Sequence, residues 1–251
     1  MMTGRLFVET IGTGDPTLIL LHGLGVNGAV WHPFVEALRW PGRVIIPDLR
    51  GHGRSAHTRN YSLAHHAVDV ADLLMPGEAV HVVGHSMGGA VGLVLASGMF
   101  GVSVARLTAF GAKKGFSDDE MAKLAKVAES PVRRFDTREA AAERFLLVAG
   151  LNGIADANSP VVEAGIREEG GHWRLCADSA TVRVAGPPLD DMVAMCRAPM
   201  RLGRGSNDPA VALADLLTFD RDAVEFDGCG HNPHVQAPEA VASLVRGLHL
   251  G

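Results

Sequence analysis

The chain has 251 residues, of which 47% are apolar and 20% charged, so its composition excludes disordered, collagen-like and coiled-coil proteins and allows one large α/β domain. Its 23 Lys and Arg residues stand against 28 Asp and Glu residues, a formal net charge of −5, which argues against a nucleic-acid partner. The three cysteines are far apart and form no CxxC pair, so neither a disulfide framework nor a zinc site is expected. Arg5, Glu9 and Asp15 interrupt the apolar run that a signal peptide needs, and we therefore expect a cytoplasmic protein.

Apolar runs that favour β-strands alternate along the chain with stretches that favour helices. The expected strands are residues 6–10, 17–21, 43–46, 80–83, 107–110, 200–203 and 223–226. The expected helices are residues 33–39, 63–74, 90–100, 210–217 and 238–248. This alternation predicts an α/β fold with a mostly parallel central sheet and helices on both faces.

One uncharged stretch, residues 79–105, is long enough to cross a lipid bilayer. Six glycines and two histidines interrupt it, and its first part is rich in valine as buried strands are. We therefore expect a buried strand, a sharp turn and a buried helix, and no membrane partner.

The alternation of strands and helices stops between residues 112 and 196. Three helix starts are expected there, two from capping-box spacing and one from a Ser-Pro pair: Ser117 with Glu120, Asp136 with Glu139, and Ser159 before Pro160. The sequence thus predicts a core made of residues 1–111 and 197–251, with residues 112–196 inserted as a helical cap. Such an insertion is expected over the carboxyl ends of the strands, where open α/β sheets bind ligands.

A glycine-rich loop follows the second expected strand. Gly23, Gly25 and Gly28 have the GxGxxG spacing of a dinucleotide-binding loop, and Asp48 stands twenty residues after Gly28. In that fold the helix begins inside the glycine loop, which would place Pro33 within its second or third turn at a cost of about 3 kcal/mol. We therefore expect the helix to begin at Pro33 and no nicotinamide or flavin to bind.

Residues 84–89, Gly-His-Ser-Met-Gly-Gly, form a GxSxG motif between an expected strand and an expected helix. This is the placement of a nucleophile elbow, in which a sharp turn exposes the serine and leaves room only for small neighbouring residues. The alternative is an ordinary tight turn whose Ser86 merely caps the helix.

Four separate motifs together resemble the α/β-hydrolase superfamily. They are His22-Gly23, Asp48-Leu49-Arg50-Gly51-His52-Gly53-Arg54-Ser55, the elbow at Ser86, and Gly230-His231. The resemblance covers residues 17–111 and residues 200–251, whereas the insertion shows no matching motif. It implies the α/β-hydrolase fold and a serine-dependent hydrolase.

The family's catalytic order of serine, acid and histidine is matched here by Ser86, Asp208 and His231. Asp208 lies in a polar loop directly after an expected strand, and its alternative role is that of a turn residue before a proline. Asp227 is the competing acid, although it is only four residues from His231 on the same loop. His234 is the competing base and is expected to have a solvated or packing role.

The resemblance also implies an oxyanion hole made of two backbone N–H groups, those of Leu24 and Met87. His22 is expected to order the loop that carries Leu24. No metal site is expected, because HExxH is absent and the adjacent His65 and His66 point in different directions, as surface residues of a helix would.

The sequence therefore predicts a hydrolase that needs no cofactor and cleaves a small carboxylic ester, lactone or thioester through an acyl-enzyme. Its expected partner is a small-molecule substrate. Hydrolysis of a carbon–carbon bond by the same triad is the nearest alternative, because a fold does not fix the chemistry. A ligand receptor with little turnover is the alternative of another class.

Overall fold

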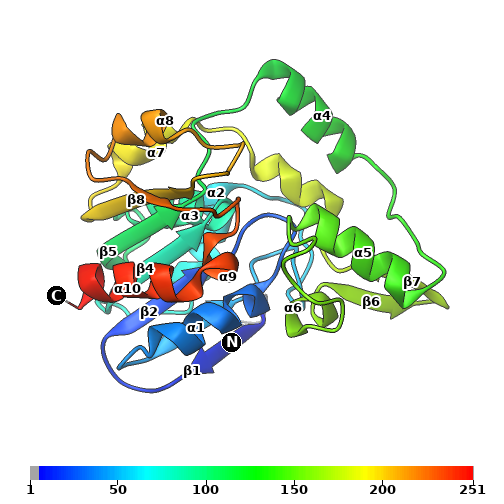
Figure 1. The fold of residues 1–251 in the computed structure, drawn as a ribbon, viewed down its shortest axis with the longest axis horizontal. Helices are drawn as coiled ribbons and strands as arrows, with labels where there is room; N and C mark the ends of the chain where they lie inside the picture. The colour runs from blue at the N-terminus through cyan, green and yellow to red at the C-terminus, as the bar shows by residue number, and fades with distance from the viewer. Residues whose placement is uncertain (1–5, 251) are drawn as a thin grey trace.

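A computed structural model describes residues 6–250 of the chain and is built around one seven-stranded sheet (Figure 1). The order across the sheet is β1-β3-β2-β4-β5-β8-β9, and every neighbouring pair is parallel except β1 with β3. The strands are β1 (Val8–Ile11), β2 (Thr17–Leu21), β3 (Val44–Pro47), β4 (Ala79–His85), β5 (Ser103–Phe110), β8 (Met200–Gly205) and β9 (Val224–Phe226). The predicted strands and their mostly parallel arrangement are confirmed.

Helices cover both faces of the sheet, as predicted. On one face α1 (His32–Leu38) packs against α10 (Pro238–His249), and on the other α2 (Leu63–Ala71) packs against α3 (Met87–Leu95). The short helix α7 (Leu189–Met195), which the sequence did not predict, packs against α3.

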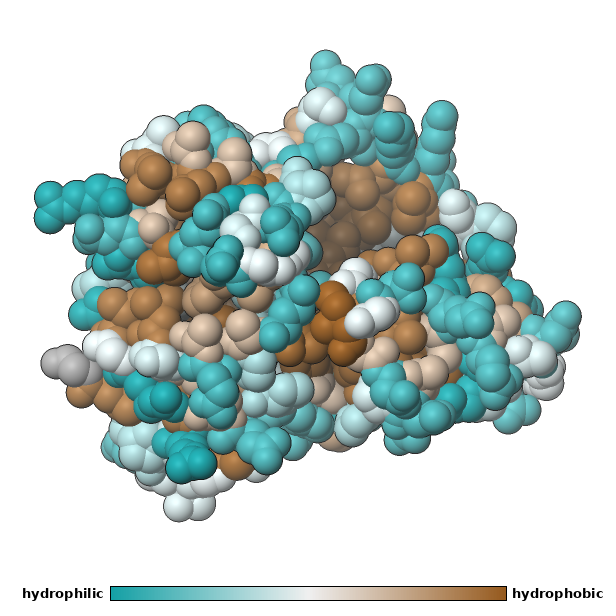
Figure 2. Space-filling view, viewed as in Figure 1, coloured by the Kyte–Doolittle hydropathy of each residue, from teal (hydrophilic) through white to brown (hydrophobic). Residues whose placement is uncertain are grey.

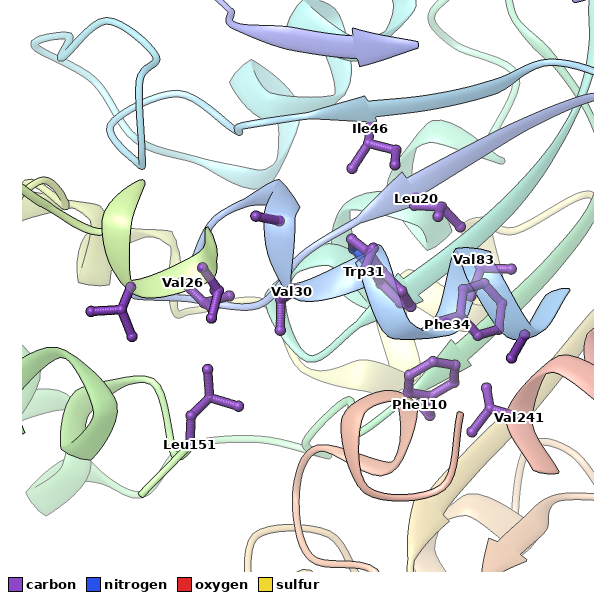
Figure 3. Close-up of a cluster of buried hydrophobic side chains, with 14 of the residues drawn as sticks. Leu20, Val26, Val30, Trp31, Phe34, Ile46, Val83, Phe110, Leu151 and Val241 are labelled. Carbon is purple, nitrogen blue, oxygen red and sulfur yellow. The ribbon is translucent and has the colours of Figure 1, made fainter. Parts of the chain in front are cut away.

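Buried strand residues divide between the two faces because side chains alternate along a strand. In β2, Leu18 and Leu20 join the cluster under α1 and α10, whereas Ile19 and Leu21 join the cluster under α2 and α3. Figure 3 shows Leu20 in the first cluster beside Trp31, whose ring lies 5.4 Å from Phe34 and 6.0 Å from Phe110. With both faces covered, the central strands are almost continuously apolar.

The uncharged stretch 79–105 forms β4, the turn at Ser86, α3 and the start of β5, as expected. Among residues 6–250, no helix has the length and apolar character that a membrane crossing needs.

The insertion contains the three expected helices: α4 (Asp118–Ala128), α5 (Arg138–Val148) and α6 (Pro160–Glu163). The capping box of Ser117 and Glu120 is present at the start of α4. The second expected box is wrong, because Thr137 and not Asp136 caps α5, through a hydrogen bond from the backbone N–H of Ala140 to its hydroxyl. Asp136 lies one residue too early for its carboxylate to take that place.

The insertion also contains a hairpin that the sequence analysis did not anticipate. Strands β6 (Ile166–Glu169) and β7 (His172–Leu175) pair antiparallel around Gly170-Gly171, both with positive φ. A Gly-Gly pair is a known signal for such a two-residue turn, but β6 is charged at three of its four positions and so lacks the apolar alternation that predicts a strand. In Figure 1, α4, α5 and this hairpin lie together on one side of the sheet.

The remaining short helices are η1 (Gly28–Trp31), η2 (Ser179–Val184), α8 (Leu213–Leu217) and α9 (Pro233–Gln236). Of these, η2 matters most for the site, since it packs against α4.

Candidate active site

Ser86 lies at a sharp turn between β4 and α3. Its backbone has φ 51° and ψ −117°, a conformation that residues other than glycine seldom adopt, and such strain is typical of functional turns. The turn closes only because its neighbours are small. A Cβ on Gly84 would lie 2.4 Å from the carbonyl oxygen of Gly88, and a Cβ on Gly88 would lie 2.1 Å from the carbonyl oxygen of Leu21. The position and the strained backbone of Ser86 are those expected of a nucleophile elbow.

Asp208 and His231 meet although twenty-three residues separate them. The Asp208 Oδ2 atom accepts a 2.8 Å hydrogen bond from Nδ1 of His231, and its Oδ1 accepts the backbone N–H of Ala210 at 2.9 Å. Asp208 follows β8 and His231 follows β9, so the two loops emerge from neighbouring strands. Their close approach depends on Gly205, where a Cβ would lie 2.1 Å from the carbonyl oxygen of Gly230.

The environment of Asp208 favours its ionised form. Burial of the carboxyl group by itself raises its pKa, but the hydrogen bond and charge of His231 outweigh burial, and the pKa of Asp208 is lowered overall. An ionised carboxylate on Nδ1 holds the imidazole with its other nitrogen, Nε2, free to accept a proton.

The competing residues have other surroundings. Asp227 is exposed, and no hydrogen bond joins it to His231 among the described residues. His234 is fully buried, with its ring 4.5 Å from that of Trp31, so the expected packing role fits and the solvated one does not. Burial is the main cause that lowers the pKa of His234, and the nearby His231 adds to it. The resulting pKa of about 3 leaves His234 unprotonated at neutral pH.

Ser86 and His231 form no hydrogen bond in the described chain, but the residue before Ser86 contacts His231. His85, the neighbour of Ser86, donates from Nε2 to the backbone carbonyl oxygen of His231 at 2.7 Å, and the two rings lie 4.7 Å apart. In enzymes without substrate the bond between nucleophile and base is often long, and it shortens in the complex.

The two backbone N–H groups predicted to form the oxyanion hole have no acceptor in the described chain. The N–H of Met87 is at the first position of α3, where no helical carbonyl can accept it. The N–H of Leu24 has no acceptor among residues 6–250. The loop carrying Leu24 is held by His22, which donates from Nδ1 to the carbonyl oxygen of Gly23 at 2.8 Å and accepts the N–H of Leu49 at 2.8 Å on Nε2. These contacts match the ordering role expected of His22.

The glycine loop 23–28 does not resemble a dinucleotide site. After η1, the α-helix begins at His32 with Pro33 in its first turn, close to the expected start. Both carboxylate oxygens of Asp48 are already used, by the backbone N–H groups of Gly28 at 2.7 Å and Arg54 at 2.8 Å. Asp48 therefore closes the loop on itself, and because its side chain is fully buried it is not accessible to a ribose hydroxyl.

A cleft opens beside Ser86, and Figure 2 shows it as an apolar hollow below α4. A cavity of about 100 Å³ at its inner end is lined by Ser86, Leu63, Met87, Phe116, Leu124 and Met192, among others. Lys113 also reaches this cavity, but it forms an ion pair with Glu120, and its ammonium lies 5.0 Å from the centre of the Phe116 ring. Because its one cation is neutralised, this part of the cleft favours an uncharged group.

The described residues contain no cluster of three or more His, Cys, Asp or Glu side chains arranged to hold a metal ion. His65 is exposed as expected, whereas His66 is fully buried, and the prediction of a surface role for His66 is wrong. The helix turns its second histidine toward the core because Ala67 and Val70 lie on the same face.

Three residues that were not predicted from the sequence hold the His231 loop. Besides His85, Asn232 donates from Nδ2 to the carbonyl oxygen of Gly150 at 3.0 Å, and Gln236 accepts the N–H of Gly230 at 2.8 Å. Only the proximity of Asn232 and Gln236 to the Gly-His pair could have indicated them.

Comparison with known proteins agrees with this geometry. The profile of the alpha/beta hydrolase family matches residues 18–244. The lipase LipV of Mycobacterium tuberculosis is 28% identical over 96% of this chain and 96% of its own length. A pimeloyl-[acyl-carrier protein] methyl ester esterase of Aeromonas hydrophila is 48% identical, but the match spans only 36% of this chain and 35% of the esterase.

Among solved structures, E-2-(acetamidomethylene)succinate hydrolase superposes with a TM-score of 0.82 at 22% identity, over 99% of this chain and 97% of its own. At that identity the likeness concerns the fold alone. The family match covers most of the core and the insertion together, and the chain therefore belongs to the alpha/beta hydrolase family.

Proposed function

We propose that this hydrolase cleaves a small carboxylic ester, lactone or thioester through an acyl-enzyme on Ser86, without a cofactor. The observation that carries the proposal is the 2.8 Å bond between Asp208 and His231 beside a strained serine elbow. The names of the two curated relatives, a lipase and a methyl ester esterase, support ester hydrolysis. The apolar wall of the cleft supports a substrate that is largely apolar near the reacting bond.

In the first half of the reaction, Ser86 Oγ attacks the carbonyl carbon while Nε2 of His231 takes its proton. The carbonyl oxygen gains the negative charge and accepts hydrogen bonds from the N–H groups of Leu24 and Met87. The tetrahedral intermediate then collapses, the bond to the alcohol or thiol breaks, and His231 returns the proton to that leaving group.

In the second half, a water molecule attacks the acyl-enzyme and gives its proton to His231. The second intermediate expels Ser86, which recovers the proton, and the carboxylic acid leaves. Asp208 remains ionised throughout and stabilises the imidazolium.

The test is a panel of esters, lactones, thioesters and diketones given to the wild type, Ser86→Ala and Ser103→Ala. Ser103 is an exposed serine at the start of β5 and is the matched control. We expect turnover and labelling by a fluorophosphonate probe in the wild type and Ser103→Ala, and neither in Ser86→Ala. Turnover of diketones alone would indicate carbon–carbon bond hydrolysis, and saturable binding without turnover that depends on Ser86 would indicate a receptor.

We also propose a cytoplasmic location and a small-molecule substrate as the main partner. All three cysteines are unpaired, and burial raises the pKa of the Cys176 thiol to about 11, which keeps it unreactive. A protein with unpaired cysteines suits a reducing compartment. Fractionation of cells carrying the tagged full chain tests this proposal.

A further inference from the structure

The cleft continues from Ser86 into a second, larger cavity of about 520 Å³. Both cavities are bordered by Leu24, the residue that supplies an oxyanion N–H group. Leu124 of α4 lines the small cavity, and Val127, one turn later on the same face, lines the large one. The helix η2 likewise borders the small cavity through Val184 and the large one through Val182. The two cavities are therefore successive parts of one cleft.

The walls of the large cavity are mostly apolar. Val127, Val132, Phe135, Val148 and Leu175 contribute to them. Figure 2 shows brown, apolar surface inside the hollow below α4. A chain of methylene groups would be removed from water there, which favours binding in proportion to the apolar area that is buried.

Two arginines stand in this apolar setting, Arg133 and Arg144. Neither forms an ion pair or a side-chain hydrogen bond with any residue in the described range 6–250. Arg133 lies with its guanidinium 5.0 Å from the centre of the Phe135 ring, which orients it over the cavity wall. Arg144 is four residues before Val148 on α5, so both lie on the same face of the helix, toward the cleft.

The one carboxylate of the large cavity does not neutralise these arginines. Asp178 accepts the hydroxyl of Tyr61 at 2.7 Å on Oδ2 and the N–H of Ala180 at 3.0 Å on Oδ1. The basic side chain nearest to it is that of His57, whose Nδ1 lies 3.7 Å from Oδ2. The large cavity thus differs from the small one, where Lys113 is paired with Glu120.

We propose that the large cavity binds the longer arm of the substrate, and that Arg133 and Arg144 bind an anionic group, a carboxylate or a phosphate, at the far end of that arm. The substrate class is then an ester of an apolar chain that ends in an anion, with the small uncharged part of the ester in the cavity beside Ser86. This proposal rests on the proposed ester hydrolysis. A planar guanidinium suits both anions because it donates two parallel hydrogen bonds.

The test compares kcat/KM for three medium-chain methyl esters that differ only in the group at the far end of the chain, which is methyl, carboxylate or phosphonate. We expect the wild type to prefer an anionic end by about tenfold at low salt and by less at high salt, since exposed charge pairs are screened. Arg133→Gln and Arg144→Gln should each lower that preference about threefold to fivefold, which is the size expected for one partly exposed pair. The carboxylate and phosphonate arms distinguish the two anions.

Two neighbouring arginines are the matched controls. Arg134 bonds to the backbone of Glu169, and Arg138 on α5 bonds to Asn158, and neither lines the cleft. Arg134→Gln and Arg138→Gln should leave the preference unchanged. If these controls lower the preference as much as the cleft variants, the effect is one of overall charge and the proposal is wrong.

A second readout does not depend on turnover. The free medium-chain dicarboxylic acid should raise the melting temperature of Ser86→Ala, and the rise should disappear when Arg133→Gln and Arg144→Gln are added. Equal kcat/KM for charged and uncharged esters, with turnover that still requires Ser86, would overturn this inference and leave the proposed function intact. Loss of all ester turnover in the wild type would instead contradict the proposed function.

Discussion

His85 holds His231 by its backbone: its Nε2 donates a 2.7 Å hydrogen bond to the carbonyl oxygen of His231. Since a carbonyl can only accept, the proton of His85 is on Nε2, and its buried Nδ1 has no partner among the described residues. Burial, with His234 and His231 nearby, keeps the pKa of His85 well below its ordinary value, so the ring remains neutral at physiological pH. His85, the residue adjacent to Ser86, thereby positions the loop that carries His231.

Replacement of His85 tests this positioning. His85→Phe keeps an aromatic ring but loses the donor, and kcat should fall about fivefold with little change in KM, as expected for one hydrogen bond of about 1 kcal/mol. His85→Gln offers an amide donor and should recover most of kcat. Steady-state kinetics on one neutral ester measures both. Equal loss in the two variants would show that ring packing, and not the hydrogen bond, matters.

Replacement of the two candidate acids should have unequal effects. Asp208→Asn should lower kcat by up to about 10⁴, because the imidazole then loses the carboxylate that holds its productive tautomer. Asp227→Asn should change kcat less than twofold, since the exposed Asp227 does not bond to His231 in the described chain. Circular dichroism should show that both variants are folded. The reverse ranking would assign the acid to Asp227.

The buried histidines should make the fold sensitive to acid. The pKa of His234 is about 3 in the folded protein against an ordinary 6.5, so between these values the unfolded chain binds a proton that the folded chain does not. Stability is therefore full above pH 6.5 and should fall by about 1.4 kcal/mol for each pH unit below it, for this histidine alone. His66 has the same pKa of about 3 and adds to the effect.

His234→Phe should reduce this sensitivity. Neither ring nitrogen of His234 has a hydrogen-bond partner in the described chain, and Trp31 and Phe110 surround it, so a phenyl ring suits the site. Urea unfolding at pH 7 and pH 5 should show a smaller loss of stability in the variant than in the wild type. An unchanged loss would mean that His234 is already protonated in the folded protein.

Replacing each of two helical glycines with alanine should change the stability of the protein in opposite directions. Gly88→Ala would place a Cβ 2.1 Å from the carbonyl oxygen of Leu21, a backbone atom that cannot easily move away. This variant should lower stability by about 1–3 kcal/mol and activity by more than tenfold. Gly247→Ala on α10 meets nothing within 4 Å and should raise stability by about 0.5–1 kcal/mol. Melting curves and ester assays measure both effects. Two similar melting temperatures would show that the elbow accommodates a methyl group.

Local sequence determined the elements of the core and the position of the elbow. The small residues around Ser86 and the valines before it predict a strand, a turn and a helix, because these depend on contacts between residues close in the chain. The same holds for the cap of α4, where Ser117 and Glu120 are three residues apart. The β6–β7 hairpin was not predicted because its strands carry many charged side chains, although Gly170-Gly171 marks its turn.

Only the tertiary structure decided which groups meet at the site. The family's residue order favoured Asp208 over Asp227 as the acid, but the hydrogen bond to His231 forms only because the register of β8 beside β9 brings the two loops together. The burial of His66 and His234, the bond from His85, and the unpaired state of Arg133 and Arg144 likewise depend on segments distant in the chain. Burial and ion pairing arise from the approach of such segments, and a linear pattern of residue types does not contain the distances that fix them.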